Sequence, residues 1–248
     1  EFEGLYFNDS DVYKVMEAAA HALHHDAHAK YGDRRLDEYL DELVGKIAAM
    51  QWEDGYVNSW FSLKKEQKRW TDIEHKHELY CAGHLIEAAV AHYRVTGKTH
   101  FLQIAEKLAG NILATFGPGK NMNPCGHPEI EIALLKLADA VGELHRSGEP
   151  YRQLARFFID QHGNKQGRQK LWGDFALDDV PLRDRREIAG HAVRAMYLFS
   201  AATDLARMQP NTGYVPALDA IWTDLTQRRM YVTGGIGNSS HNEGFTVP

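Results

Sequence analysis

The sequence has few cysteines, no long apolar run and almost no alternation of polar and apolar residues. Its two cysteines, Cys81 and Cys125, exclude a disulfide framework and favour a reducing, cytoplasmic setting. No apolar run approaches the roughly 20 residues that a membrane-spanning helix needs. The 28 lysines and arginines are spread among 34 acidic residues, giving a net charge of −6 and arguing against a nucleic-acid partner. We expect neither a nucleic-acid nor a membrane partner, and the sequence leaves the oligomeric state open.

Helical periodicity accounts for most of the 248 residues. An apolar stripe at spacings of three and four begins at Val12, directly after the capping residues Asp9-Ser10-Asp11. Similar stripes predict seven further helices, over residues 36–47, 79–95, 101–113, 130–144, 154–159, 188–208 and 215–225. The one short strand candidate is Tyr231-Val232-Thr233. We therefore predict a single all-α domain over residues 1–248, without a β-sandwich domain.

The helices recur in pairs, and one helix of each pair begins near a Gly-His step. These steps are Gly83-His84, Gly126-His127 and Gly190-His191. Their separations, 43 and 64 residues, are too irregular for a tetratricopeptide array, whose period is about 34. They favour concentric helices whose inner members direct equivalent ends toward a common cleft. Because the chain starts without a Met and stops at Pro248 without a closing element, we expect a toroid that is incomplete at both ends.

His84, His127 and His191 are the candidate binding residues of that cleft. Each follows a glycine, which lets a backbone approach a ligand closely, and a neutral imidazole offers one hydrogen-bond donor and one acceptor. A single histidine in this context more often caps or packs its own helix, whereas three in a repeated context predict a shared pocket. Some aromatic residues could stack on a sugar, although hydrophobic packing is the commoner role: Trp52, Tyr56, Trp60, Trp70 and Trp172.

Several histidines have the spacing of metal ligands. His21, His25 and His28 lie on one face of a helix, but their polar flank is typical of a solvated helix end. His75 and His77 form a weaker candidate. A zinc site would also need a second cluster of ligands beside Cys81, and Cys125 supplies only one more. We therefore predict no metal site within this chain.

Glu243 lies in a glycine-rich loop, Gly234-Gly-Ile-Gly-Asn-Ser-Ser-His-Asn-Glu-Gly-Phe245. This loop is not a phosphate loop, because no Gly-Lys-Ser/Thr follows it, and the sequence has no Gly-x-Ser-x-Gly elbow. From its local sequence alone, Glu243 would be interpreted as an ordinary glutamate in a solvated loop. A carboxyl group beside an aromatic ring in a partly dry cleft can have its pKa raised enough to donate a proton.

Six motifs occur in a fixed order along the chain. They are Tyr6-Phe-Asn-Asp-Ser-Asp-Val-Tyr-Lys14, Gln51-Trp-Glu-Asp-Gly-Tyr56, His77-Glu-Leu-Tyr-Cys-Ala-Gly-His84, Gly126-His-Pro-Glu-Ile-Glu131, Gly190-His-Ala-Val-Arg194 and Met230-Tyr-Val-Thr-Gly-Gly-Ile-Gly237. Because of these motifs taken together, the chain resembles the glycoside hydrolase family 127 β-L-arabinofuranosidases, a family long catalogued as a domain of unknown function. The likeness covers nearly the whole chain, although no single motif would suffice.

The resemblance implies an (α/α)6 barrel that in the family is followed by β-sandwich domains. It implies that His84, His127 and His191 contact the hydroxyl groups of an arabinofuranose. Glu243 would be the general acid/base of a retaining mechanism, protonating the leaving glycosidic oxygen and then activating water. The expected partner is an oligosaccharide or glycoside substrate.

The family's nucleophile is a cysteine thiolate held on zinc, and it follows the Glu-Gly-Phe motif. The corresponding residues lie beyond Pro248, and neither Cys81 nor Cys125 matches them. The resemblance thus implies zinc in the full-length family but no cofactor bound by this chain. We expect residues 1–248 alone to be inactive.

Two alternatives stay open. The chain could be another (α/α)6 carbohydrate enzyme, such as a sugar epimerase or an unsaturated-uronyl hydrolase. The latter would place its essential aspartate on the inner helices, so that Asp54 or Asp72 would matter more than Glu243. The second alternative is a catalytically inactive helical scaffold that binds glycans or a partner protein.

Overall fold

The protein is described by a computed structural model over residues 3–26, 34–64 and 68–246. Within these ranges the long helices are α1 (Asp9–Asp26), α2 (Arg34–Met50), α4 (Glu78–Thr96), α5 (His100–Thr115), α6 (Ile130–Glu143), α7 (Glu149–Gln161), α8 (Ala192–Met208) and α9 (Val215–Asp224). The shorter elements are α3 (Ser59–Lys64), the 3-10 turns η2 (Asp174–Ala176), η3 (Leu182–Asp184) and η4 (Pro210–Thr212), and the π-helical turn η5 (Leu225–Arg229). These ranges contain isolated β-bridges but no strand, which confirms the all-α prediction.

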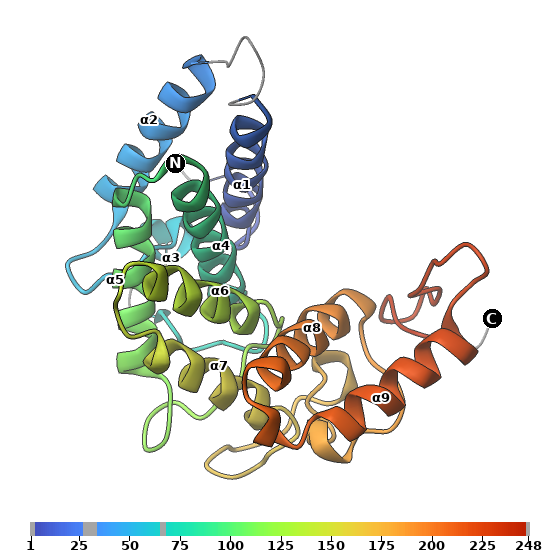
Figure 1. Ribbon diagram of the computed structural model, residues 1–248. Coiled ribbons are helices and arrows are strands. Elements are labelled where there is room, and N and C mark those ends of the chain that lie inside the picture. Colours follow the sequence, from blue (N-terminus) through green and yellow to red (C-terminus); the bar gives the residue numbers. More distant parts are fainter. Residues whose placement is uncertain (1–2, 27–33, 65–67, 247–248) are drawn as a thin grey trace.

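The helices form two layers that curve together (Figure 1). In the inner layer α1 packs on α4, α4 on α6 and α6 on α8, whereas α2, α5, α7 and α9 each pack on the inner helix that precedes them. This alternation of inner and outer helices is the (α/α) arrangement expected from the Gly-His repeats. The described pairs form an arc, and their inner helices bring sequence-distant motifs side by side. None of the described helices is long and apolar enough to cross a membrane.

Helix α4 is covered by three other helices, because α1, α5 and α6 all pack against it. Its residues from Glu78 to His92 are buried on every side, and leucine, isoleucine and alanine make up much of that surface. The helix ends at Gly97, whose φ of 73° is left-handed and whose N–H donates to the Tyr93 carbonyl at 2.8 Å. A helix buried on all faces can hold polar side chains only where neighbours satisfy them.

Two expectations about local structure need correction, and one short helix was missed. The helix predicted over residues 188–208 begins only at Ala192, because Gly190 has a φ of 77° and cannot continue a helix. Tyr231-Val232-Thr233 is not a strand but part of a turn, in which Gly234 N–H donates to the Tyr231 carbonyl at 2.8 Å. Helix α3 carries too few residues for a periodic pattern and was not predicted.

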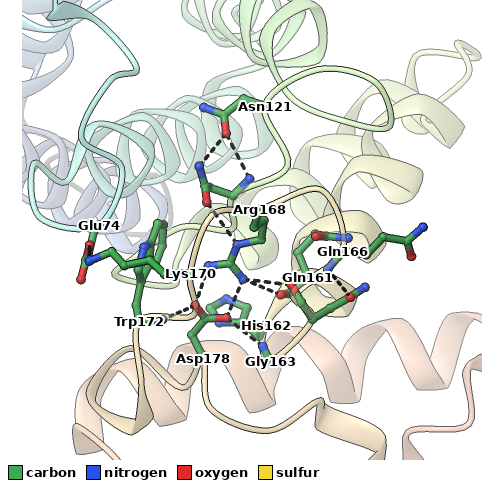
Figure 2. A network of polar contacts seen from close by, with 12 residues as sticks. Glu74, Asn121, Gln161, His162, Gly163, Gln166, Arg168, Lys170, Trp172 and Asp178 are labelled. Atoms are coloured by element: carbon green, nitrogen blue, oxygen red, sulfur yellow. Dashed lines mark hydrogen bonds and ion pairs between the residues drawn. The ribbon is translucent and has the colours of Figure 1, made fainter.

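The segment between α7 and α8 is folded around a buried ion pair (Figure 2). The side chains of Arg168 and Asp178 are both fully buried, and two hydrogen bonds of 2.7 and 2.5 Å join them. Asp178 also accepts from the N–H groups of Gly163 and Trp172, each at 2.8 Å. The Trp172 ring packs 4.9 Å from the Arg168 guanidinium. One carboxylate thus fixes three points of an otherwise irregular segment.

Replacing Asp178 tests this role. Asp178→Ala leaves the Arg168 guanidinium buried without its carboxylate, so we expect a loss of about 3–5 kcal/mol in the free energy of unfolding. Urea unfolding followed by circular dichroism measures the loss. The control is Glu143→Ala, which breaks the half-exposed Arg94–Glu143 pair and should cost less than about 1 kcal/mol. Equal losses in the two variants would contradict the structural role of Asp178.

Candidate active site

The three predicted histidines meet at one end of the inner helices. The ring centroids of His127 and His191 lie 5.9 Å apart. His84 joins them through Tyr80, whose ring lies 4.5 Å from that of His84 and 4.4 Å from that of His127. All three histidines are buried, with exposures of 3 to 9%. The structure therefore brings together residues that lie more than 40 positions apart in sequence.

Two further rings of this cluster come from the start of α4. Tyr80, which was not singled out from the sequence, lies one turn before His84 on the same face of the helix. His77, which the sequence offered only as a weak metal candidate, is the residue that precedes the helix. The His77 ring lies 5.3 Å from that of His127, and its backbone is left-handed with a φ of 57°. The sequence signal for Tyr80 was its spacing of four from His84 on a helix that is otherwise mostly apolar.

Helix α8 adds a ring and a charge. The Tyr197 ring lies 6.0 Å from His84 and 5.9 Å from His127. Arg194 donates to the Gly126 carbonyl at 2.9 Å, and its guanidinium lies 4.0 Å from the centre of the Phe175 ring. Tyr197 stands three residues after Arg194, so both lie on the helix face that also carries His191.

Glu243 is hydrogen bonded to His191, at 2.7 Å between the carboxylate and Nε2. On its other side, His191 Nδ1 accepts from the backbone N–H groups of Val193 and Arg194 and so caps α8. Because Nδ1 accepts, a neutral His191 ring carries its proton on Nε2 and donates it to Glu243. The helix cap therefore selects the tautomer that holds the carboxylate.

The backbone of Glu243 is strained. Its φ of 45° and the 57° of Asn242 are left-handed, a region that costs a residue with a side chain about 1–3 kcal/mol. The Glu243 carbonyl accepts from the Ala192 N–H at 3.0 Å, which ties the loop to the first turn of α8. The partly dry surroundings expected for this carboxyl group are not found among the described residues, where the side chain is 77% exposed.

The glycines of the Gly-His steps serve protein packing and not the approach of a ligand. A Cβ added at Gly83 would lie 1.3 Å from a carboxylate oxygen of Glu129. At Gly126 it would lie 2.2 Å from the Glu74 carbonyl oxygen, and at Gly190 2.1 Å from that of Asp174. The expectation that these glycines make room for a ligand is therefore wrong. They make room for neighbouring backbone and for a buried acid, which sets the position of each histidine.

Glu129 occupies the notch at Gly83 and lies beside His84, with 3.6 Å between a carboxylate oxygen and Nδ1. Its side chain is fully buried, and burial raises its pKa well above the usual value, with a further rise from the nearby Glu87 carboxylate. Lys136 forms an ion pair with Glu87. Burial therefore favours the protonated form of Glu129, which lies behind the histidines and next to the Glu87–Lys136 ion pair.

The histidines facing this region are neutral at pH 7. Burial lowers the pKa of His84 to about 3, with a smaller contribution from Lys14. Burial and then the Arg194 charge lower the pKa of His127 to about 3, and burial brings that of His77 to about 4. Neutral imidazoles and two tyrosine hydroxyls provide both donors and acceptors. Such a lining suits an uncharged ligand rich in hydroxyl groups.

The cysteines of this chain do not fit a zinc-bound nucleophile. Cys81 and Cys125 are both 1% exposed, and burial raises the pKa of each thiol. Cys125 donates to the His127 carbonyl at 2.7 Å and Cys81 to that of Phe7 at 3.6 Å. Reactive and metal-binding cysteines are thiolates in electropositive, accessible surroundings, and neither residue has such surroundings.

The other metal and aromatic candidates are distributed through the fold. The side chain of His21 is exposed, whereas those of His25 and His28 lie outside the described residues. His75 is exposed and hydrogen bonded to Asp72 at 3.0 Å. The aromatic residues mostly pack internally: Trp52 and Tyr56 under Arg69, Trp70 against Phe116, Trp172 on Arg168, and Trp60 near Tyr6.

Asp54 and Asp72 do not occupy the positions that an unsaturated-uronyl hydrolase would need. Both lie in the loops between α2 and α4 and not on the inner helices. Asp54 pairs with Arg69 at 3.0 Å. That alternative is therefore not supported by the placement of its essential aspartate.

The fold and the cluster define a protein of paired inner and outer helices, whose inner helices bring several buried histidines together. Residues 1–248 match the family described as β-L-arabinofuranosidase, GH127 catalytic domain. A non-reducing end β-L-arabinofuranosidase from Bifidobacterium longum subsp. longum is 36% identical over 99% of the chain, which spans 39% of that relative. The chain belongs to glycoside hydrolase family 127.

Solved structures agree with this assignment. A family 127 β-L-arabinofuranosidase from Geobacillus stearothermophilus T6 is 38% identical, with a TM-score of 0.90 over all of this chain and 40% of its own. A second family 127 β-arabinofuranosidase is 35% identical, with a TM-score of 0.87 over 99% of this chain and 38% of its own. The chain thus spans about two fifths of the length of these relatives.

Replacing Gly83 tests the packing of Glu129 behind His84. Gly83→Ala puts a methyl group where the Glu129 carboxyl lies, so we expect a loss of about 1–3 kcal/mol in the free energy of unfolding. The control is Gly110→Ala in α5, where an added Cβ has nothing within 4 Å and should raise stability by up to about 1 kcal/mol. Urea unfolding measures both, and a stabilised Gly83→Ala would contradict the close approach.

The lowered histidine pKa values predict a dependence of stability on pH. Between pH 6.5, the ordinary value, and about 3 the unfolded chain holds a proton on His84 that the folded chain does not. Stability therefore falls as the pH is lowered through this window, by up to about 1.4 kcal/mol per pH unit for each such ring.

His84→Gln isolates that effect. Between pH 6 and 5 the variant should lose roughly 1 kcal/mol less stability than the unsubstituted chain, as measured by urea unfolding at each pH. Tyr197→Phe is the control, because it alters the same cluster without removing a group that titrates in this range. Identical pH slopes for His84→Gln and the unsubstituted chain would show that His84 is charged when folded.

Proposed function

We propose that this chain forms the acid/base side and sugar-binding wall of a retaining glycoside hydrolase that releases terminal β-L-arabinofuranose. Glu243 is the proposed general acid/base, and His84, His127 and His191 are the proposed contacts to the sugar hydroxyls. The observation that carries the proposal is the His191–Glu243 hydrogen bond of 2.7 Å on a left-handed backbone. Strain of this kind clusters at functional sites, where a side chain must be held in one position.

The proposed first half-reaction is protonation of the leaving oxygen by Glu243. In its carboxylic acid form Glu243 gives that oxygen its proton as the bond from the anomeric carbon to the oxygen breaks and a bond to a nucleophile from outside residues 1–248 forms. The resulting carboxylate accepts the Nε2–H of His191. In the second half-reaction the carboxylate removes a proton from water, whose oxygen replaces the nucleophile at the anomeric carbon, and the original acid is restored. His191 keeps its own proton throughout, because its other nitrogen caps α8.

The sugar-binding role is supported by the chemistry of the histidine cluster. Rings that are neutral at pH 7 bind hydroxyl groups without demanding a charged ligand. The Tyr80 hydroxyl accepts from Lys14 at 2.7 Å, which leaves its own proton free to be donated. An arabinofuranose presents hydroxyl groups on a small ring and no charge, so it matches this lining better than a uronate or a phosphorylated sugar would.

The nucleophile is proposed to come from outside residues 1–248. The two relatives named as β-L-arabinofuranosidases are about two and a half times as long as this chain. Neither Cys81 nor Cys125 has the exposure or surroundings of a nucleophile. We therefore infer that the chain alone binds sugar without cleaving it, and that no zinc step involves its cysteines.

The assignment of Glu243 is tested in the longest native polypeptide that contains residues 1–248. We expect Glu243→Gln to lower kcat on 4-nitrophenyl β-L-arabinofuranoside at least about 100-fold, because general acid–base catalysis contributes about 10²–10⁴-fold. Azide should restore part of the rate and yield an arabinosyl azide of retained configuration, since azide needs no general base. The readouts are nitrophenolate release and product analysis.

The matched control is Glu143→Gln, an exposed glutamate of α6 that pairs with Arg94 far from the histidines. It should leave kcat unchanged. Full activity in Glu243→Gln would refute the acid/base role, and sugar binding without turnover in the longest polypeptide would instead support a scaffold. A uniform loss that azide does not relieve would assign Glu243 to binding.

A further inference from the structure

Apart from the histidine cluster, a group of side chains that could ligate a metal ion lies where α2 meets the end of α4 and the start of α5. Asp37, Asp41 and His92 each offer a ligand atom within 4.8 Å of the others. Asp37 and Asp41 are one turn apart on α2, and His92 comes from the last turns of α4. The proposed glycosidase reaction does not use any of these residues.

His92 is the unexplained member of the group. It is 1% exposed, and among the described residues neither ring nitrogen has a hydrogen-bond partner. A buried polar group without a partner costs about 1–3 kcal/mol. The Oδ1 atom of Asp41 also lacks a partner there. The His92 ring on α4 and Asp41 Oδ1 on α2 therefore lie close together, and neither has a hydrogen-bond partner among the described residues.

A cation already occupies part of that space. The Lys98 ammonium lies 2.7 Å from Asp37 Oδ1 and 2.6 Å from Asp41 Oδ2. One ammonium balances only one of the two carboxylates, and an ammonium has no acceptor to offer His92. A divalent cation would balance both carboxylates and accept the imidazole lone pair as well.

A fourth ligand is within reach. His100 Nε2 lies 3.7 Å from Asp41 Oδ1, and the His92 and His100 rings are 6.0 Å apart. The Asp37, Asp41 and His100 side chains are each 40 to 50% exposed, so they can rotate toward an ion and an ion can reach them. Two imidazole nitrogens and two carboxylates are a set that Zn²⁺ accepts, with ligands at about 2.0–2.2 Å.

We propose that Asp37, Asp41, His92 and His100 form a Zn²⁺ site that fastens α2 to α4 and α5, with Lys98 as the side chain that the ion displaces. The site is structural, because α2 packs only lightly on α5, and an ion shared by three helices would close that contact.

The test is a Zn²⁺ titration of the longest native polypeptide after removal of metal with a chelator. Zinc chloride is added in competition with a chromophoric chelator, and bound equivalents and apparent Kd are compared between variants. We expect Asp41→Asn and His92→Gln each to weaken one site by more than about tenfold, since even the loss of a residue that only orients a ligand costs about 10–100-fold. Lys98→Met should tighten the same site, because the competing ammonium is gone.

Two controls make the result decisive. His21→Gln/His25→Gln removes the histidine-rich end of α1 and should leave the titration unchanged. Zn²⁺ should also raise the Tm of the unsubstituted protein but not that of Asp41→Asn, whose change is at the surface and should not prevent folding. If Lys98→Met and the unsubstituted protein bind no more Zn²⁺ than Asp41→Asn, or if the site is lost only in His21→Gln/His25→Gln, the proposal is wrong.

Discussion

The close approach of α4 and α6 at Gly83 is the contact on which the candidate site depends. Only a residue without a side chain leaves room there for the Glu129 carboxyl, which lies beside His84. Burial raises the pKa of this acid and lowers that of the neighbouring imidazole, so it favours the uncharged form of both groups. The same approach brings His127, which precedes α6, against Tyr80 of α4. A change in the packing of α4 on α6 at Gly83 would therefore also change the ionisation of Glu129 and His84.

The opposite end of the site is organised by a helix terminus. His191 satisfies two N–H groups of α8 and holds the Glu243 carboxylate with its remaining nitrogen. The Ala192 N–H binds the Glu243 carbonyl, so the first turn of α8 holds both the backbone and the side chain of the proposed acid. The left-handed backbone of Glu243 is tolerated because these bonds offset its cost. An exposed loop glutamate thereby has a defined position without a buried environment.

Much of the fold could be predicted from the sequence, because apolar stripes of period 3.6 mark helices whatever their partners are. The three histidines and Glu243 could be named as candidates from the Gly-His repeats and the family motifs, and their geometry is consistent with those roles, which stay predictions. Tyr80 escaped notice because it lies on a helix buried on all faces, where periodicity is weak, and His77 was considered only as a metal ligand. The function of Gly83 could not be inferred, since its neighbour Glu129 lies 46 positions away and only the folded chain brings them together. The cytoplasmic setting and the single domain over residues 1–248 also stay predictions.

The cap that His191 places on α8 has a consequence for how protons travel. An imidazole can relay a proton only by taking one on one nitrogen while releasing one from the other, and here the second nitrogen is occupied by two backbone donors. Relay through His191 would require the first turn of α8 to come apart. The ring thus orients the Glu243 carboxylate without offering it a route for protons into the protein interior. In the proposed reaction Glu243 would therefore exchange protons with the ligand and with solvent, whatever the titration state of the buried carboxyls.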